Sequence, residues 1–168
     1  MIIISDTSPI NYLVLIGDIG ILEALFKRVL IPPAVLNEMQ HPKTPRTVKD
    51  WINNPPAWLE VKRADDSLFT PSKRIADGER EVIALAIELN AAAILIDDRD
   101  GTLEARKQGL IALGTVNALE RAAEMNLLDL PEAIDRLRQT SFRLPPIGLL
   151  AAMFERDRQR KALGQLGA

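Results

Sequence analysis

The sequence predicts an α/β protein with a twisted parallel sheet of about five strands and helices on both faces. Short apolar runs alternate along the chain with segments of helical spacing, the pattern of parallel strands joined by crossover helices. Two of these runs, Ile2–Asp6 and Ala93–Asp97, end directly in a carboxylate. Ligands of open parallel sheets bind outside the carboxyl ends of the strands, so we expect both acids at one functional edge.

Periodicity and turn signals place the elements in order. The expected strands are Ile2–Asp6, Val29–Ile31, Leu59–Val61, Ala93–Asp97 and Leu110–Leu113. The expected helices are Pro9–Ile16, Ile19–Lys27, Pro33–Gln40, Pro45–Asn53, Gly78–Asn90, Thr102–Gln108, Val116–Met125, Pro131–Gln139 and Ile147–Leu163. The polar, aperiodic stretches around His41-Pro42 and from Asp65 to Ser72 are expected to be surface loops.

Composition favours one soluble domain. The 168 residues, 47% of them hydrophobic, are enough for one substantial core. The absence of cysteine excludes disulfides and thiolate metal sites and fits a reducing cytoplasm. No stretch approaches the roughly 20 apolar residues of a membrane span, and the first residues lack a basic leader, so we expect a cytoplasmic protein without membrane contact.

The carboxylate of Asp6 is expected to be free for chemistry. Ser8 and Pro9 can supply the N-cap and the first residue of the next helix, so Asp6 is not needed as a cap. Glu38 follows the strand Val29–Ile31 on a short helix that can aim it at the same edge, or it is an ordinary exposed residue. Asp97, Asp98 and Asp100 follow the other acidic strand, and at least one of them is expected to cap the following helix.

Glu79 begins the apolar stripe of the helix Gly78–Asn90, in line with Val82 and Ile83. We therefore expect its carboxylate near the protein body, whereas Glu81 and Glu88 lie off the stripe and are expected to be solvated. The alternative is that Glu79 only complements the positive end of the helix dipole.

Carboxylates that converge on one edge repel one another, and a divalent cation relieves that repulsion. Oxygen-only ligands suit Mg²⁺ or Mn²⁺, and the matching chemistry is hydrolysis of a phosphodiester. The sequence offers few residues for other kinds of catalysis. His41 is the sole histidine, which argues against a Ser-His-Asp triad. There is also no glycine-rich phosphate loop. Trp51 and Trp58 are expected to pack rather than to stack on bases.

Five motifs, in order and spacing, resemble those of the PIN domains, metal-dependent ribonucleases that include the (VapC-like) toxins of type II toxin–antitoxin pairs. The motifs are Ser5-Asp6-Thr7-Ser8, Pro32-Pro33-Ala34-Val35-Leu36-Asn37-Glu38, the helix that begins Gly78-Glu79, Ile94-Leu95-Ile96-Asp97-Asp98-Arg99, and Gly114-Thr115. Ser-Asp-Thr-Ser-Pro followed by Asn11, with Gly-Glu in place of the more usual Asp opening the later helix, is similar to a PIN-like branch of those toxins.

The resemblance implies a three-layer fold with strand order 3-2-1-4-5 and an acidic Mg²⁺ or Mn²⁺ site. It implies that Asp6 binds metal directly, that Glu79 and Asp97 or Asp98 complete the site, and that Glu38 orients water or a metal-bound ligand. The choice between Asp97 and Asp98 stays open because neighbours in a strand face opposite sides. Asp100 is a lesser candidate.

The resemblance further implies an endoribonuclease for single-stranded or loop RNA, a cognate antitoxin as partner, and a homodimer. We expect a catalytic domain over residues 1–140 and a C-terminal helical extension, residues 141–168, packed on it. Two alternatives stay open: a PIN-like RNA- or protein-binding module with weak catalysis, and a metal-dependent phosphotransferase of another doubly wound fold. A receiver-like phosphotransferase needs a lysine after the last strand, where this chain has Gly114-Thr115.

The end of the chain is basic. Residues 136–168 carry 7 basic and 2 acidic side chains, against 14 basic and 21 acidic in residues 1–135. Either the last helix has a solvated basic end, or this end neutralises RNA phosphates near the acidic edge. The residues concerned are Arg156, Arg158, Arg160 and Lys161.

Overall fold

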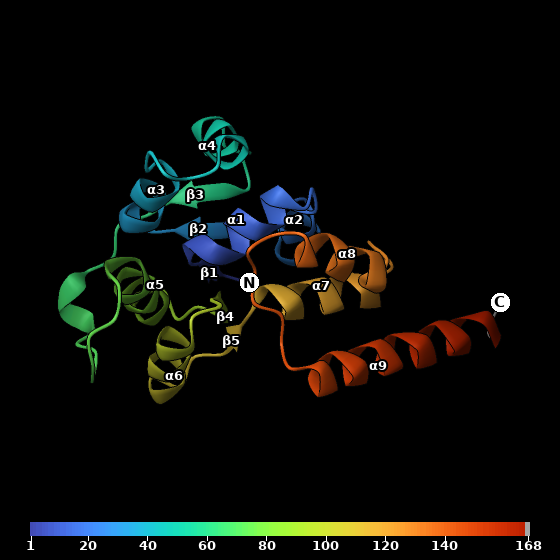
Figure 1. Cartoon of the computed structure of the whole chain (residues 1–168). Helices are drawn as coiled ribbons and strands as arrows, with labels where there is room; N and C mark the ends of the chain where they lie inside the picture. Colours follow the sequence, from blue (N-terminus) through green and yellow to red (C-terminus); the bar gives the residue numbers. More distant parts are fainter. Residues whose placement is uncertain (167–168) are drawn as a thin grey trace. The chain divides into compact units, whose positions relative to one another are not determined.

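The structure, a computed structural model, describes residues 1–166, without the side chains of Asp66, Gln165 and Leu166. The chain divides into two compact units, Met1–Thr115 and Val116–Ala168, coloured from blue to yellow and from yellow to red in Figure 1. Each unit is described by itself below.

A five-stranded, all-parallel sheet forms the centre of the first unit. Its strands are β1 (Ile3–Ser5), β2 (Val29–Ile31), β3 (Leu59–Val61), β4 (Ala93–Leu95) and β5 (Ala112–Leu113). Their spatial order is β3-β2-β1-β4-β5, which confirms the predicted order. The bounds of β2 and β3 are as predicted, whereas β1, β4 and β5 are shorter than expected. The expected end residues Asp6 and Asp97 follow β1 and β4 instead of belonging to them.

Burial explains why the three inner strands are almost purely apolar. Every residue of β1, β2 and β4 is buried, as expected for parallel strands covered on both faces. The edge strand β3 is different, because Val61 is exposed and Glu60 pairs with Arg28. The carboxyl ends of β1, β2 and β4 are all fully buried, and Asp6 directly follows that of β1.

Helices flank the sheet, as predicted. In the first unit they are α1 (Thr7–Leu15), α2 (Ile21–Phe26), α3 (Pro33–Met39), α4 (Arg46–Asn53), α5 (Asp77–Glu88) and α6 (Arg99–Lys107), with a short 3-10 helix η1 (Asp66–Leu68). Helix α1 packs on α3 and α4, and α5 packs on α3 and α6. The rings of Trp51 and Trp58 lie 6.0 Å apart, so these residues pack as expected.

The strand order creates a switch point between β1 and β4. From β1 the chain proceeds to β2 and β3 on one side, and then returns to β4 and β5 on the other. In such sheets the crevice for ligands opens between the two strands where the direction reverses. Asp6 follows β1 and Asp97 follows β4, and the Asp6 backbone N–H donates to the Leu95 carbonyl at 2.8 Å. The fold thus places both acids at the switch point.

The second unit is helical, with α7 (Thr115–Glu124), α8 (Leu130–Arg138) and α9 (Ile147–Leu166). Helix α8 packs on α9, whose buried positions include Leu150, Met153 and Asp157. Among the helices of residues 1–166, none is long and apolar enough to cross a membrane.

Candidate active site

Asp6 lies between β1 and the first residue of α1, and its carboxylate does not cap that helix. Helix α1 begins at Thr7, so the prediction that Ser8 is the N-cap and Pro9 the first helical residue is wrong. Proline has no N–H to lose and is tolerated throughout the first turn, so Pro9 does not fix the helix start. Asp6 occupies the cap position in an extended conformation, without a side-chain cap hydrogen bond. The expectation that its carboxylate is not used for capping is confirmed.

Asp97 and Asp98 point to different partners. The Asp97 carboxylate accepts hydrogen bonds from the backbone N–H and the hydroxyl of Thr115, at 2.7 and 2.6 Å. Asp98 is the N-cap of α6: its Oδ2 accepts from the backbone N–H groups of Asp100 and Gly101, at 2.7 and 2.9 Å. One aspartate of the three therefore caps the helix, as predicted, and it is Asp98.

Glu38, on α3, lies against the first turn of α5. It accepts a hydrogen bond from the Thr7 hydroxyl, so it is tied to the residue after Asp6. A Cβ placed on Gly78 would lie 2.7 Å from the Glu38 Oε1 atom and 3.2 Å from its Cδ. The glycine at this position therefore leaves the space that the Glu38 carboxylate occupies.

Glu79 is half-buried at the start of α5, as its place on the apolar stripe predicted. It accepts a hydrogen bond from the Ala76 backbone N–H at 3.2 Å, so it also serves the helix terminus. Its Cγ and Cδ atoms lie beside Gly101 of α6, each 3.3 Å from a Cβ placed there. Both expectations for Glu79 are thus met together: it approaches the protein body and it complements the helix end.

Electrostatics link these acids. The pKa of Asp6 is raised from 3.8 to about 7, mainly by burial and also by the charges of Glu38, Glu79 and Asp97, against a hydrogen bond from the Thr7 backbone. Burial also raises the pKa of Glu79, with contributions from Asp98, Glu38 and Asp100. The pKa of Asp97 is raised by burial, although Thr115 opposes that change. The structure therefore places three of the predicted acids, Glu38, Glu79 and Asp97, close enough to Asp6 for their charges to raise its pKa.

The chemistry of this set fits a hard divalent cation, because every donor is an oxygen and because a positive charge would relieve the raised pKa of Asp6. The spacing is wider than such an ion requires. Within residues 1–166, no three acidic or histidine side chains stand close enough together to hold a metal. Binding of an ion therefore requires these side chains to close in from the positions that the structure shows.

A cavity of about 450 Å³ adjoins the acids at Glu79. It lies where the segment before α5 meets the first turn of α6. Its lining residues are Arg74, Ile75, Ala76, Asp77, Glu79, Asp98 and Asp100. The acids of α5 and α6 thus face a space large enough for part of a polymeric substrate.

Sequence reasoning missed two carboxylates that organise this region. Glu81 was expected to be solvated, but it is partly buried and accepts a hydrogen bond from the Ala34 backbone N–H at 3.0 Å, which joins α5 to the start of α3. Glu104 is 1% exposed and binds Ser72 and Lys107. Ala34 and Ser72 are distant in sequence from the acids that bind them, and an acid among polar residues gives no signal of a distant hydrogen bond.

The basic end of α9 is engaged within its own unit. Arg156 pairs with Glu120 at 2.6 Å, Arg158 pairs with Glu155, and Arg160 pairs with Asp157 at 2.6 Å. Lys161 bonds to both Asp129 and Asp157. These contacts favour the interpretation of a packed amphipathic helix over that of an arm for RNA.

Together, a parallel sheet of order 3-2-1-4-5 and acids at its switch point define an α/β protein with an acidic edge suited to cation chemistry. The family model that matches the chain, over residues 2–154, is that of a PIN domain. The chain therefore belongs to the PIN-domain family, whose members are generally nucleases and generally use divalent metals. Comparison with curated proteins gives no match, and comparison with solved structures gives none.

Proposed function

We propose that this protein is a Mg²⁺- or Mn²⁺-dependent endoribonuclease that hydrolyses single-stranded or loop RNA at the acidic edge. The observation that carries the proposal is Asp6, a carboxylate 6% exposed and set among Glu38, Glu79 and Asp97, with its pKa raised to about 7. Among residues 1–166, no lysine or arginine bonds to it. An acid in such an environment is characteristic of functional sites.

Asp6, Glu79 and Asp97 would hold the cation, with Asp98 beside them. When bound, the cation lowers the pKa of water and neutralises charge on the phosphate. Asp97 is held in place by Thr115, and Asp98 keeps Oδ1 available while Oδ2 serves the amides of α6. Hydrogen bonds within the first unit thus orient Asp97 and Asp98 before any substrate binds, and the acids would close in to share one ion.

Glu38 would orient the attacking water and accept its proton. It is held by the Thr7 hydroxyl at one oxygen, Oε2, and its other oxygen lies beside Gly78. In the reaction the water oxygen forms a bond to phosphorus, and the bond from phosphorus to the leaving ribose oxygen breaks. One proton of the water passes to Glu38 and then to solvent, and the leaving oxygen takes a proton from solvent.

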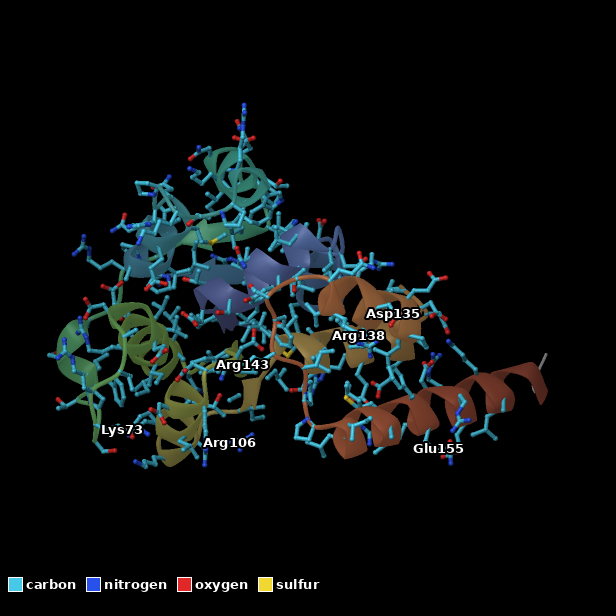
Figure 2. All side chains as sticks on the ribbon, viewed as in Figure 1. Lys73, Arg106, Asp135, Arg138, Arg143 and Glu155 are labelled. Carbon is cyan, nitrogen blue, oxygen red and sulfur yellow. The ribbon has the colours of Figure 1, made fainter. Side chains whose placement is uncertain are left out.

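The test is cleavage of a 5′-labelled single-stranded RNA by the full chain with Mn²⁺, with Mg²⁺ and with chelator. We expect cleavage only with metal, and a loss of at least about a hundredfold in Asp6→Asn. Asp135→Asn is the matched control, because Asp135 is an exposed aspartate of α8 (Figure 2) and its loss should leave cleavage within twofold. Metal-independent cleavage, or equal activity of Asp6→Asn and wild type, would contradict the proposal.

A binding module with weak catalysis is the second candidate, and one observation favours it. The acids of the edge are separately engaged, Asp98 by α6, Asp97 by Thr115 and Glu79 by Ala76, and no three of them converge within the described residues. The same assay distinguishes the two: binding of RNA without cleavage under all metal conditions identifies the module.

The toxin role, with a cognate antitoxin, a homodimer and a cytoplasmic location, extends the proposal. Its support is the resemblance of the Ser5-Asp6-Thr7-Ser8 and Gly78-Glu79 motifs to those of toxin PIN domains. Induced expression in bacteria should arrest growth with the wild type and not with Asp6→Asn. Light scattering after gel filtration should give a mass twice the 18.6 kDa of one chain. Normal growth with the wild type, or a monomer, would remove these extensions and leave the nuclease proposal standing.

A further inference from the structure

The cavity beside Glu79 contains a cation among acids. Four of its lining residues are acidic, Asp77, Glu79, Asp98 and Asp100, and Arg74 carries the one positive charge among the described residues that line it. A cavity lined only by carboxylates would repel the RNA backbone, so this arginine is the lining group suited to attract it.

Each of the four acids already has a partner, which reduces its effect on a phosphate. Asp77 pairs with Arg80 at 3.8 Å and Asp100 pairs with Lys73. Glu79 accepts from the Ala76 backbone, and Asp98 accepts from two amides of α6. Two of the four acids are thus paired with other cations, and Arg74 forms no ion pair with the remaining two among the described residues.

Arg74 differs from its basic neighbours. Lys73 and Arg80 are ion-paired, whereas the structure of residues 1–166 gives the exposed Arg74 side chain no hydrogen bond or ion pair. A guanidinium presents five N–H donors in a planar fork that matches two oxygens of a phosphate. The donors of Arg74 are thus unused by the described residues and suited to a phosphate.

The backbone before Arg74 is anchored to α6. The Ser72 backbone N–H donates to Glu104 Oε2 at 2.9 Å, and the Ser72 hydroxyl donates to Glu104 Oε1. Lys107 bonds to both groups, at 2.6 and 2.7 Å, and Lys73 pairs with Asp100 (Figure 2 labels Lys73 on this segment). We refer to Ser72 and Lys73 with their partners on α6 as the strap. After Arg74, the chain is held again where Ala76 donates to Glu79.

We propose that Arg74 is a positioning residue that binds a backbone phosphate of the RNA in this cavity, while a neighbouring phosphate meets Asp6 and the other acids. The inference rests on the proposed function. The strap anchors the chain directly before Arg74, which lines the cavity. Glu79 both lines the cavity and acts on Asp6, so the two phosphate positions are neighbours.

Binding of RNA is measured in the Asp6→Asn background with chelator, so that cleavage does not interfere. The probe is a fluorescent single-stranded RNA of mixed sequence, titrated at several salt concentrations. Arg74→Ala should weaken binding at least about tenfold, because a charge-assisted hydrogen bond is lost. It should also reduce the slope of log affinity against log salt by about 0.7, the contribution of one phosphate contact on a single strand.

Three further variants separate the charge of Arg74, the planar geometry of its guanidinium and the anchoring of its backbone by the strap. Arg74→Lys keeps the charge and loses the fork, so the salt slope should be retained while affinity falls severalfold. Ser72→Ala removes part of the strap and should weaken binding without changing the slope. Arg106→Ala is the matched control, because Arg106 is an exposed arginine of α6 outside the cavity (Figure 2), and it should leave binding within twofold. In an otherwise wild-type chain with Mn²⁺, Arg74→Ala should raise KM more than it lowers kcat.

The outcomes separate this inference from the proposed function. If the wild type cleaves RNA but Arg74→Ala and Arg106→Ala have the same affinity and the same salt slope, the assignment of Arg74 is wrong and the nuclease stands. If the wild type neither binds nor cleaves RNA, both fail. Circular dichroism and melting temperature of each variant should match the parent, because the Arg74 side chain is exposed and supports no other group of the described structure.

Discussion

Two aspartates of this chain are buried to the same extent but have neighbours of opposite charge. Asp6 in the first unit is 6% exposed, and Asp157 in the second unit is 5% exposed. Asp157 is bonded to Arg160 at 2.6 Å and to Lys161 at 2.9 Å, whereas the charges that act on Asp6 come from Glu38, Glu79 and Asp97. The pKa of Asp6 is accordingly raised to about 7, by burial first and then by those acids. Burial alone would raise the pKa of Asp157, but its two cationic partners lower it.

The difference shows that unpaired burial at Asp6 is not a general property of this protein. Another buried carboxylate of the first unit, Glu104, is paired: it is bonded to Lys107 and Ser72, and its pKa is lowered to about 2. A buried acid without a cation lowers the free energy of unfolding. Acids with pKa values shifted in this way are found most often at functional sites. A metal cation from solution would supply Asp6 with the positive charge that Arg160 and Lys161 of α9 supply to Asp157.

The same substitution should therefore change stability in opposite directions. In chelator at pH 8, Asp6→Asn should raise the free energy of unfolding by roughly 2–4 kcal/mol, because it removes a buried charge whose pKa is shifted from 3.8 to about 7. Asp157→Asn should lower it by about 1–3 kcal/mol, because Arg160 and Lys161 lose their partner. Urea denaturation followed by circular dichroism measures both.

The two effects should also respond differently to pH. The folded pKa of Asp6 lies above its unfolded value, so the destabilisation is complete above about pH 7 and disappears as pH falls from 7 to 3.8. The folded pKa of Asp157 is lowered, so its stabilisation is present above the unfolded pKa and is lost as pH falls through the folded one. Stabilities of the two variants that change in the same direction at pH 8 would contradict the comparison.

Two glycines extend the comparison of the two units to the rate of RNA cleavage. Gly78 and Gly148 are each the second residue of a helix, α5 in one unit and α9 in the other. A Cβ at Gly78 would lie 2.7 Å from Glu38 Oε1, whereas a Cβ at Gly148 would meet nothing within 4 Å. Gly78→Ala should displace the flexible end of Glu38 and lower kcat/KM for RNA on the order of tenfold, with stability within about 1 kcal/mol of wild type.

Gly148→Ala is the control for that change. It should leave kcat/KM unchanged and raise the free energy of unfolding by about 0.5–1 kcal/mol, the usual difference between glycine and alanine in a helix. Equal activity of the two alanine variants would show that the position of Glu38 is not important for cleavage.

The last expected effect concerns the strap and is confined to acidic pH. The pKa of Glu104 is lowered from 4.5 to about 2 by Lys107 and Ser72, so the stability that it contributes is complete above about pH 4.5 and is lost as pH falls toward 2. Glu104→Gln should therefore show a weaker dependence of unfolding free energy on pH between these values than wild type. Glu124→Gln, a change at an exposed glutamate, is the control, and an identical pH dependence in Glu104→Gln and wild type would contradict the paired state of Glu104.

Much of the fold was predictable because it depends on local patterns. The apolar runs gave the five strands, and periodicity gave all nine predicted helices among the described residues, with ends that differ by a few positions. Strand order followed from the family resemblance and is confirmed. The start of α1 was wrong, because a proline in the first turn is compatible with several helix starts.

The site was predictable only in part, because its arrangement depends on distant partners. Alternation could not separate Asp97 from Asp98: both follow the last residue of β4, and their directions are set by Thr115, 18 residues from Asp97, and by the amides of α6. The strap joins Ser72 to Glu104 across 32 residues, and nothing in either local sequence indicates it. Arg74 gave no sequence signal, because one arginine in a polar loop resembles any solvated cation.

Binding of Mn²⁺, measured by isothermal titration calorimetry without RNA, tests the central claim most directly. Wild type and Asp135→Asn should bind Mn²⁺ with the same affinity, and Asp6→Asn should bind at least about tenfold more weakly. The melting temperature should rise with Mn²⁺ in the first two proteins and return to its starting value in chelator. Equal Mn²⁺ affinity in wild type and Asp6→Asn, or no binding to the wild type at millimolar Mn²⁺, would contradict the account of Asp6 as the centre of a cation site.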